Sequence, residues 1–238
     1  MNWRELSTER LGVGVRHVDR NGQKAYEHTF DEVLSFHAPG FAPVIKNGVS
    51  WYIDATGNSV FSRRFRKAFG FYEGLASVLD DTGAFHIDEH GHDAYAARFC
   101  WCGNFQEKRC VVRDEDAMYY HIKSDGASAY PERYRYVGDF KYGVAVAQRS
   151  DGLSTHIFLD GQFVHGIWFQ DAAPYHKGVA AVCDEKGWFH VDERGRPLYG
   201  RRFLSVEPFY NGQAHAVGLD GRRLVIGNDG GVIVDLTR

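Results

Sequence analysis

The chain has 238 residues, of which 44% are hydrophobic and 15% aromatic, so it can bury a sizeable core and is not an intrinsically disordered protein. The formal net charge is −3, and both signs are interspersed along the chain without a basic block or an aromatic–basic stripe. This charge pattern lacks the electrostatic attraction that nucleic acids and anionic membrane surfaces need, so we expect neither as a partner.

The N-terminal segment and the cysteine content indicate a cytoplasmic protein. The segment MNWRELSTERLG is polar and has no apolar core of the kind that a signal peptide carries. No apolar run in the chain is long enough to cross a bilayer. The four cysteines are few for a disulfide framework in a chain of this length.

Seven short motifs, most of them centred on a histidine, recur along the chain. In chain order they are RHVD, WYID, FHID, YHIK, THIF, FHVD and LVIG, and their second residues are 34 or 35 positions apart. These second residues are His17, Tyr52, His86, His121, His156, His190 and Val225. A glycine column and two aromatic columns keep the same spacing. Four columns in one register indicate about seven tandem repeats.

We predict that residues 1–238 form a single repeat domain. Its units lie near 5–35, 36–70, 71–104, 105–139, 140–174, 175–208 and 209–238. Each unit has a first strand of small apolar residues (LASVL, VAAVC), a second strand with the central motif (AFHIDE, WFHVDE) and a third strand of bulky residues (DAYAARF, PLYGRRF). Glycine in the intervening turns supplies the positive φ that tight hairpins need. The predicted fold class is therefore all-β, with three-stranded antiparallel meanders as the repeating unit.

The repeat resembles the WG (or KWG) β-repeat family. That family's pattern of an aromatic residue, Gly-x-Ala-x-Val, a turn, a Trp-Gly-like strand with Ile-Asp and a glycine is seen in FYEGLASVLDDTGAFHIDEHG and PYHKGVAAVCDEKGWFHVDERG. The similarity extends over nearly the whole chain, but the Trp-Gly step is mostly Phe-His or Tyr-His, and only Trp51 and Trp188 keep the tryptophan. The resemblance implies a β-repeat fold found largely in bacterial proteins, and it implies little about activity.

A single three-stranded meander cannot bury its faces alone, so the units must stack, either as a closed β-propeller-like ring or as an open β-solenoid. Small residues in the first strand and large ones in the third fit the crowded axis and wide periphery of a propeller. The last predicted strand, VIVDL, is apolar and does not look like a polar cap. A ring would remove the edge that this strand presents. We therefore predict the ring, with the open solenoid as the alternative.

Columns that recur in most repeats are interpreted as scaffold. The histidines occur once per repeat and cannot converge on one ion, so we expect no metal site. We expect each imidazole to bond an adjacent turn or the aspartate two residues further on, as with Asp19, Asp88 and Asp192. The repeated arginines and tyrosines before the third-strand aromatic residue are expected to form a peripheral ladder between blades.

Positions that break the repeat are the better candidates for function, because the scaffold does not require them. The first strand begins with an apolar residue in most units, but with Arg109 and Gln213 in two of them. Two residues after Gln213 the last unit has His215. Alternation along a strand places these three side chains on the same kind of face, where we predict ligand binding. The alternative is a structural exception at each position.

A further variable column follows the second aromatic column. It comprises His37, Tyr72, Gln106, Lys141, His176 and Tyr210. We expect these residues to lie in the crossings between blades, around one mouth of the ring, where they could bind a small polar or aromatic ligand. The alternative is that they are solvated loop residues.

The chain contains no phosphate-binding glycine loop, no His-Glu-x-x-His and no nucleophile elbow. We therefore predict a binding module for a small molecule or a protein partner, without a cofactor. The alternative is a cofactor-independent enzyme that uses His, Tyr, Arg and Lys side chains for acid–base chemistry. Its catalytic candidates are His215, Arg109, His37 and His176.

Overall fold

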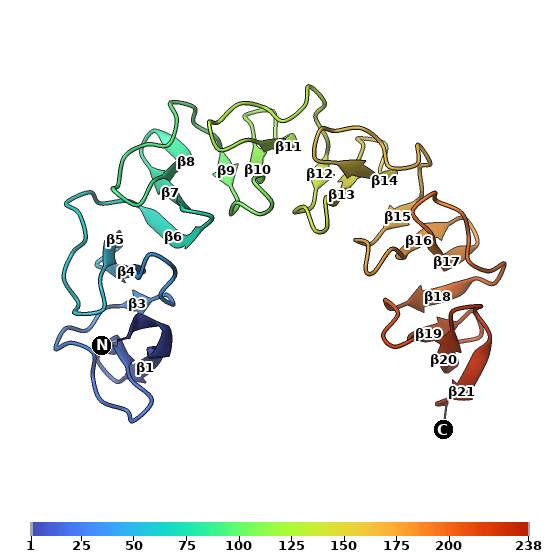
Figure 1. The fold of residues 1–238 in the computed structure, drawn as a ribbon, viewed down its shortest axis with the longest axis horizontal. Coiled ribbons are helices and arrows are strands. Elements are labelled where there is room, and N and C mark those ends of the chain that lie inside the picture. The colour runs from blue at the N-terminus through green and yellow to red at the C-terminus, as the bar shows by residue number, and fades with distance from the viewer. Residues whose placement is uncertain (1, 238) are drawn as a thin grey trace. The chain divides into compact units, whose positions relative to one another are not determined.

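The computed structural model describes residues 2–237, in which short antiparallel strands follow one another along the chain (Figure 1). Two compact units are present. The N-terminal unit comprises Met1–Ala117 with His121–Ser128, and the C-terminal unit comprises Met118–Tyr120 with Ala129–Arg238. No helix in the described part of the chain is both long enough and apolar enough to span a membrane.

The N-terminal unit begins with a 3-10 helix, η1, and continues as small sheets. Its elements are η1 Trp3–Glu5, β1 Ser7–Leu11, β2 Gly14–Val18, β3 Glu32–Val33, β4 Ala42–Lys46, β5 Val49–Ile53, β6 Lys67–Tyr72, β7 Leu75–Asp80, β8 Gly83–Ile87, β9 Trp101–Cys102 and β10 Cys110–Arg113; β11 Tyr119–Ile122 follows. β1 pairs with β2, and the three-stranded sheets have the orders β3-β4-β5, β6-β7-β8 and β11-β10-β9.

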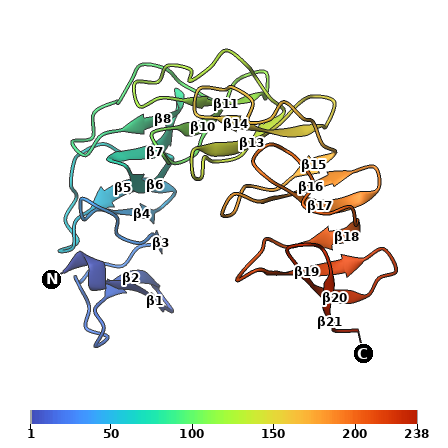
Figure 2. The same ribbon diagram turned by 45° about the vertical axis from the view of Figure 1, so that its right-hand side comes forward.

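The C-terminal unit contains a three-stranded sheet and a longer sheet that joins two repeats. Its strands are β12 Tyr136–Val137, β13 Val144–Gln148, β14 Ser154–Phe158, β15 Asp171–Ala172, β16 Ala180–Asp184, β17 Gly187–Val191, β18 Phe203–Val206, β19 Gln213–Gly218, β20 Arg223–Gly227 and β21 Val232–Asp235. The orders are β12-β13-β14 and β15-β16-β17-β18-β19-β20-β21 (Figure 2). Pairing of Trp188 with Phe203 links β17 to β18 and makes the second sheet continuous.

The middle strand of each three-stranded sheet is the predicted strand of small residues, as in β7 and β13. The central-motif strand follows it on one side, as predicted. The third strand is different from the predicted one: it is the short strand that precedes the small-residue strand, such as β12. The bulky segment after β8 forms no regular strand and pairs with β8 through the isolated bridges Ile87–Asp93 and Ala84–Phe99.

The predicted third strand is wrong because its tyrosine turns inward to meet the central-motif histidine. The hydroxyl of Tyr95 lies 2.5 Å from Nδ1 of His86, and Nε2 of His86 lies 3.0 Å from the carbonyl oxygen of Gly103. Because a carbonyl only accepts, Nε2 carries the proton and Nδ1 accepts the tyrosine O–H. His17 and His190 have the same two kinds of partner: a tyrosine hydroxyl nine residues after the histidine and a backbone carbonyl oxygen seventeen residues after it.

Asp19, Asp88 and Asp192, which follow three of the histidines, bond backbone N–H groups of their turns, so the expected bond from aspartate to imidazole is wrong. Oδ1 of Asp88 accepts the backbone N–H groups of His90 and His92 at 2.9 and 2.8 Å, which closes the turn after β8. The carboxylate therefore satisfies backbone donors, as Asp commonly does in turns. The imidazole is left to the tyrosine and the carbonyl, and the histidine column is a buried structural element.

The repeated arginine covers the ring that precedes the histidine. The guanidinium carbon of Arg98 lies 3.7 Å from the ring centre of Phe85, and that of Arg202 lies 3.5 Å from the ring centre of Phe189. Both contacts are within cation–π range. The arginine column thus packs within its own repeat, which supports a structural role and not the predicted ladder between blades.

Candidate functional site

The variable column that follows the aromatic residues lies in hairpin turns within the sheets, not in crossings between them. Lys141 pairs with Val144, His176 with Val179 and Tyr210 with Gln213 across two-residue turns. In these turns both central residues have positive φ, for example 52° at Lys177 and 80° at Gly178. Positive φ at both positions is the type I′ geometry that connects two antiparallel strands.

Members of this column stack on one another between successive repeats of each unit. In the N-terminal unit the rings of His37 and Tyr72 are 4.7 Å apart, and in the C-terminal unit those of His176 and Tyr210 are 4.9 Å apart. Nε2 of His176 is buried and has no hydrogen-bond partner among the residues that the structure describes.

The N-terminal unit also holds two other predicted residues. Gln106 and Arg109 pair across one hairpin turn, and a guanidinium nitrogen of Arg109 donates to the carbonyl oxygen of Lys108 at 3.0 Å. Arg109 is half-buried and Gln106 exposed. The predicted approach of Arg109 to Gln213 and His215 stays a prediction.

Three of the predicted residues line one pocket in the C-terminal unit. Tyr210, Gln213 and His215 surround a volume of about 280 Å³ together with Glu207. We call these four residues the C-terminal polar site. The ring of His176 contacts the ring of Tyr210 at the edge of this site.

The β19 strand presents the site through its alternation. Gln213 and His215 are exposed, whereas Ala214 and Ala216 between and after them are buried. The small buried residues fix the strand in the core, and the polar ones consequently face outward. The backbone amide of Glu207 donates to the carbonyl oxygen of His215 at 2.9 Å, which places the two side chains on neighbouring strands.

The scaffold holds the opposite wall of the site. Nε2 of His190 donates to the carbonyl oxygen of Glu207 at 3.0 Å. His190 itself is fully buried, with its Nδ1 at 2.5 Å from the hydroxyl of Tyr199. The buried histidine therefore fixes the backbone from which the Glu207 carboxylate extends.

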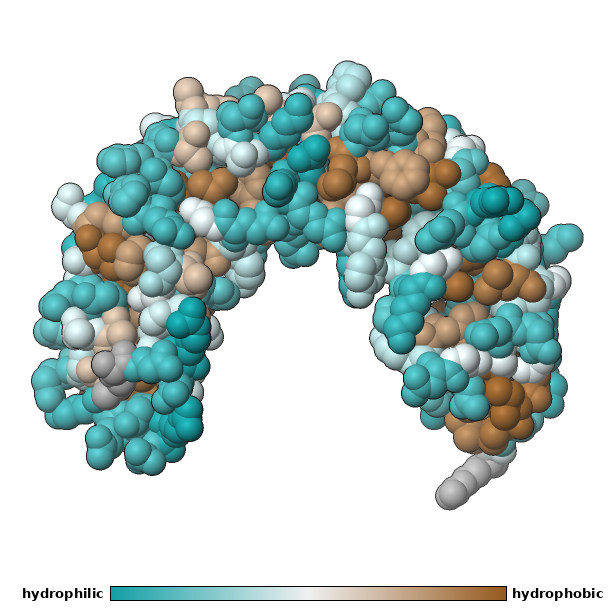
Figure 3. Space-filling model, in the orientation of Figure 1, coloured by the Kyte–Doolittle hydropathy of each residue, from teal (hydrophilic) through white to brown (hydrophobic). Residues whose placement is uncertain are grey.

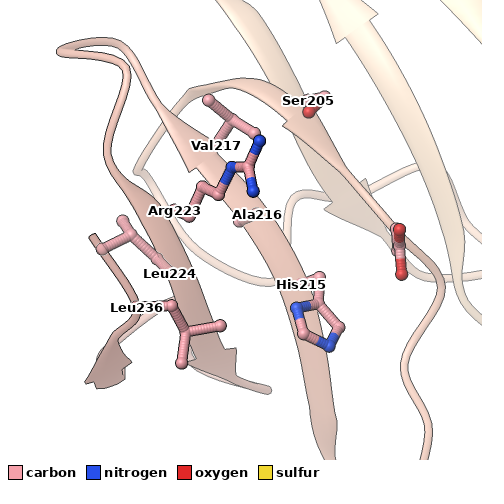
Figure 4. A pocket seen from close by; sticks show the side chains of 8 residues that line it. Ser205, His215, Ala216, Val217, Arg223, Leu224 and Leu236 are labelled. Carbon is pink, nitrogen blue, oxygen red and sulfur yellow. The ribbon is translucent and has the colours of Figure 1, made fainter. Parts of the chain in front are cut away.

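A second hollow of about 490 Å³ shares His215 and Glu207 with the polar site. Figure 4 shows the His215 imidazole and the Arg223 guanidinium on the same side of β19 and β20. The register explains this placement, because Arg223 pairs with Val217, two residues after His215. Ser205 pairs with Val217 from the other side. The hollow thus offers an imidazole, a guanidinium, a carboxylate and a hydroxyl to one ligand.

The sequence interpretation did not include Glu207 and Arg223, although a signal for both was present. The positions equivalent to Glu207 in the earlier repeats are Leu34, Phe69, Gly103, Gly138 and Ala173. The positions equivalent to Arg223 are Val15, Ser50, Ala84, Tyr119, Ser154 and Trp188. Each residue is the charged member of an otherwise uncharged column, which is the same kind of departure that identified Gln213 and His215.

Within residues 2–237, no three His, Cys, Asp or Glu side chains are grouped so that they could hold a metal ion. The histidines of the central motif have their nitrogens engaged by tyrosine and carbonyl partners, as at His17 and His190.

The family model described as WG containing repeat matches residues 18–49 and 52–81, so the resemblance seen in the sequence is confirmed in the N-terminal region. No curated protein gives a significant match.

Several solved structures are similar to this chain at 10–13% sequence identity. A crystal structure titled the eukaryotic initiation factor has a TM-score of 0.58 at 10% identity, covering 96% of this chain and 72% of that one. The computationally designed Ika8 protein has a TM-score of 0.52 at 13% identity, with 97% and 83% covered. The WD40 beta propeller domain of Doa1 has a TM-score of 0.40 at 13% identity, with 92% and 88% covered. Identities this low show the fold alone.

The predicted fold class is confirmed: the chain is all-β and consists of repeated small antiparallel sheets. Closure of the repeats into a ring stays a prediction.

Proposed function

We propose that the protein is a binding module that holds a small polar or aromatic ligand, or a partner peptide, at the C-terminal polar site. The observation that carries the proposal is the convergence of Tyr210, Gln213 and His215 with Glu207 around one pocket. The first three were selected from the sequence because they vary or break the repeat.

The site suits a ligand with both hydrogen-bond donors and acceptors. The Gln213 amide and the His215 imidazole each offer a donor and an acceptor, and the Glu207 carboxylate accepts. The Tyr210 ring is 61% exposed and provides a flat apolar surface beside these groups. An apolar wall with a few convergent polar groups is the usual composition of a small-molecule site.

A thermal-shift screen tests the proposal, using amino acids, carboxylates, phosphates, nucleosides and short peptides as probes. We expect at least one probe to raise the unfolding temperature, because a ligand at 100 times its Kd stabilises the folded state by about 2.7 kcal/mol. The variants His215→Ala and Gln213→Ala should weaken its binding about tenfold. Because both side chains are exposed, the unliganded stability should stay within about 0.5 kcal/mol of the wild type.

His90→Ala is the matched control, since His90 is exposed in the turn after β8 and lies outside the polar site. It should bind the probe as the wild type does. Unliganded destabilisation of both site variants would identify Gln213 and His215 as structural residues and refute the proposal. A panel without any stabilising probe would also count against it.

The second candidate function is that of a cofactor-independent enzyme. It is favoured by one observation, the presence of His215 and Glu207 in both the 280 Å³ pocket and the 490 Å³ hollow. An imidazole and a carboxylate at one site can act as general base and general acid. Incubation of each binding probe with the protein, followed by mass spectrometry, separates the functions. Turnover that His215→Ala abolishes would establish the enzyme, and an unchanged probe supports the binding module.

A further inference from the structure

A groove in the C-terminal unit collects aromatic side chains from two successive repeats. Tyr142, Phe158 and Tyr175 line a volume of about 530 Å³ together with Lys177 and Glu193. We call these five residues the aromatic groove. Figure 3 shows apolar side chains at the surface over β13 and β14, which contribute to it.

Tyr142 occupies a backbone position that is unfavourable for an aromatic residue. It is the first central residue of its hairpin turn and has a φ of 55°. The equivalent residues in other repeats are Glu73, Glu107, Lys177 and Asn211, with φ between 50° and 52°. Left-handed backbone is strained for every residue with a Cβ, and the other repeats place charged or amide side chains there. Tyr142 is nevertheless there, and its side chain is 68% exposed.

Phe158 also departs from its column. Most repeats have an aspartate here, and those aspartates accept two backbone N–H groups of the following turn, as Asp192 does from Arg194 and Arg196 at 2.9 Å each. Phe158 cannot accept these bonds, and one of them is replaced by a bond from the backbone N–H of Gln162 to Oδ1 of Asp160 at 3.0 Å. Phe158 is the last residue of β14 and is 43% exposed. The scaffold does not require an exposed aromatic ring at this position.

Tyr175 forms a fixed, buried part of the groove. The other members of its column are all phenylalanine: Phe36, Phe71, Phe105, Phe140 and Phe209. The Tyr175 hydroxyl donates to the carbonyl oxygen of Asp192 at 3.0 Å, and the residue is 6% exposed. Burial raises the pKa of the Tyr175 phenol, so the hydroxyl stays neutral and keeps donating to this carbonyl.

The same groove recurs one repeat later with a different lining, which gives an internal comparison. There Lys177 takes the place of Tyr142, and Asn211 and Asn228 take those of Lys177 and Glu193. That groove, of about 590 Å³, keeps only one aromatic residue, Phe209. Packing of successive repeats therefore does not require exposed aromatic residues at these positions.

We propose that the aromatic groove is a second binding site, for a small molecule that combines an aromatic ring with a positive and a negative charge, as an aromatic amino acid does. The exposed rings of Tyr142 and Phe158 would pack against the ligand ring. Ring contacts of this kind add to the affinity gained from burying apolar area. The proposal does not depend on the C-terminal polar site, which has different residues.

The two charged residues specify the charges of the ligand. Lys177 lies in the turn at one wall, and a Cβ on the adjacent Gly178 would lie 3.4 Å from Oε1 of Glu193. The carboxylate of Glu193 is thus close to the turn that carries the ammonium group of Lys177. Lys177 complements a ligand carboxylate and Glu193 a ligand ammonium, so a zwitterion is favoured over a ligand with one charge.

Isothermal titration with L-phenylalanine, 2-phenylethylamine and phenylacetate tests the proposal. L-Phenylalanine should bind most tightly. Phe158→Asp and Tyr142→Asn restore residues that other repeats use, so both variants should fold at least as stably as the wild type. Each should weaken L-phenylalanine binding about tenfold through the lost ring contact. Lys177→Ala should remove the preference over 2-phenylethylamine, and Glu193→Gln the preference over phenylacetate.

Asn228→Ala is the control, because Asn228 occupies the position of Glu193 in the equivalent groove. It should leave L-phenylalanine binding unchanged. The proposal is overturned if none of the three probes binds saturably, or if L-phenylalanine binds Phe158→Asp as it binds the wild type. Equal affinity for all three probes would overturn the assignment of Lys177 and Glu193.

Discussion

Lowering the pH from 7 to 5 should destabilise the protein through its buried histidines. His86 and His156 have no exposed surface, and burial lowers the pKa of each to about 4 from an ordinary value of 6.5. Between pH 6.5 and 4 the unfolded chain therefore binds more protons than the folded one. Stability consequently falls as the pH falls through this window.

The size of the effect follows from the two pKa values. At pH 7 a histidine is largely neutral in both states. At pH 5 the unfolded histidine is almost fully protonated, whereas His86, with a pKa of about 4, is still mostly neutral. The free energy of unfolding should then drop by about 2 kcal/mol for this one residue. His156, with the same shifted pKa, should contribute a similar loss.

A double variant isolates the contribution of His86. The second repeat already uses Tyr52 and Phe61 where the third uses His86 and Tyr95, and the Tyr52 hydroxyl donates to the carbonyl oxygen of the same column at 2.8 Å. The variant His86→Tyr with Tyr95→Phe therefore installs a natural pair that does not titrate between pH 5 and 7. Its stability should depend less steeply on pH, by about 2 kcal/mol over this range.

Urea unfolding followed by circular dichroism at pH 7 and pH 5 measures this difference. Any constant cost of repacking at position 86 cancels, because each protein is compared with itself at the two pH values. His90→Ala, which removes an exposed imidazole, should keep the wild-type slope. If the double variant loses as much stability on acidification as the wild type, the buried-histidine explanation is refuted.

Two further changes test the packing between repeats. Gly57→Ala should cost about 1 kcal/mol or more beyond Gly22→Ala in urea unfolding, because both glycines have positive φ but only a Cβ at Gly57 would meet Tyr26, at 2.6 Å from its Cγ; equal losses would contradict this reasoning. Deletion of residues 213–238 removes β19–β21 and the buried Leu224 from the seven-stranded sheet, so we expect the C-terminal unit to unfold. A soluble truncation with native circular dichroism would favour the open solenoid over the ring.

The sequence could predict the repeat, the all-β class and the scaffold role of the histidines, because all three depend on periodicity. It could not predict the partner of each histidine. The sequence pattern predicts a regular strand around Tyr95. The alternation of side chains in such a strand does not predict a contact with a residue nine positions earlier. The irregular segment after β8 forms because the buried imidazole of His86 needs a partner, and that requirement is a tertiary one.

The candidate site was predictable in part. Tyr210, Gln213 and His215 converge because they belong to one hairpin, whose Asn-Gly turn is a strong local signal. Glu207 joins them through pairing between β18 and β19, which the sequence interpretation did not foresee because it placed the third strand elsewhere. Arg109 belongs to the N-terminal unit, so its relation to these residues does not follow from any local pattern.

The residues that depart from the repeat differ in how much folding stability they cost. A costly departure is stronger evidence for function than one that costs little. Gln213 and His215 are exposed polar residues on a strand and cost the scaffold little. Tyr142 places a bulky exposed ring on left-handed backbone, where the equivalent residue one repeat later is Lys177 with a φ of 52°. Phe158 gives up one backbone hydrogen bond of about 1 kcal/mol that Asp192 makes in the next repeat, since Asp160 accepts the other from Gln162. Two exposed aromatic residues that the scaffold does not require meet in one groove, and a bound aromatic ligand explains them better than packing does.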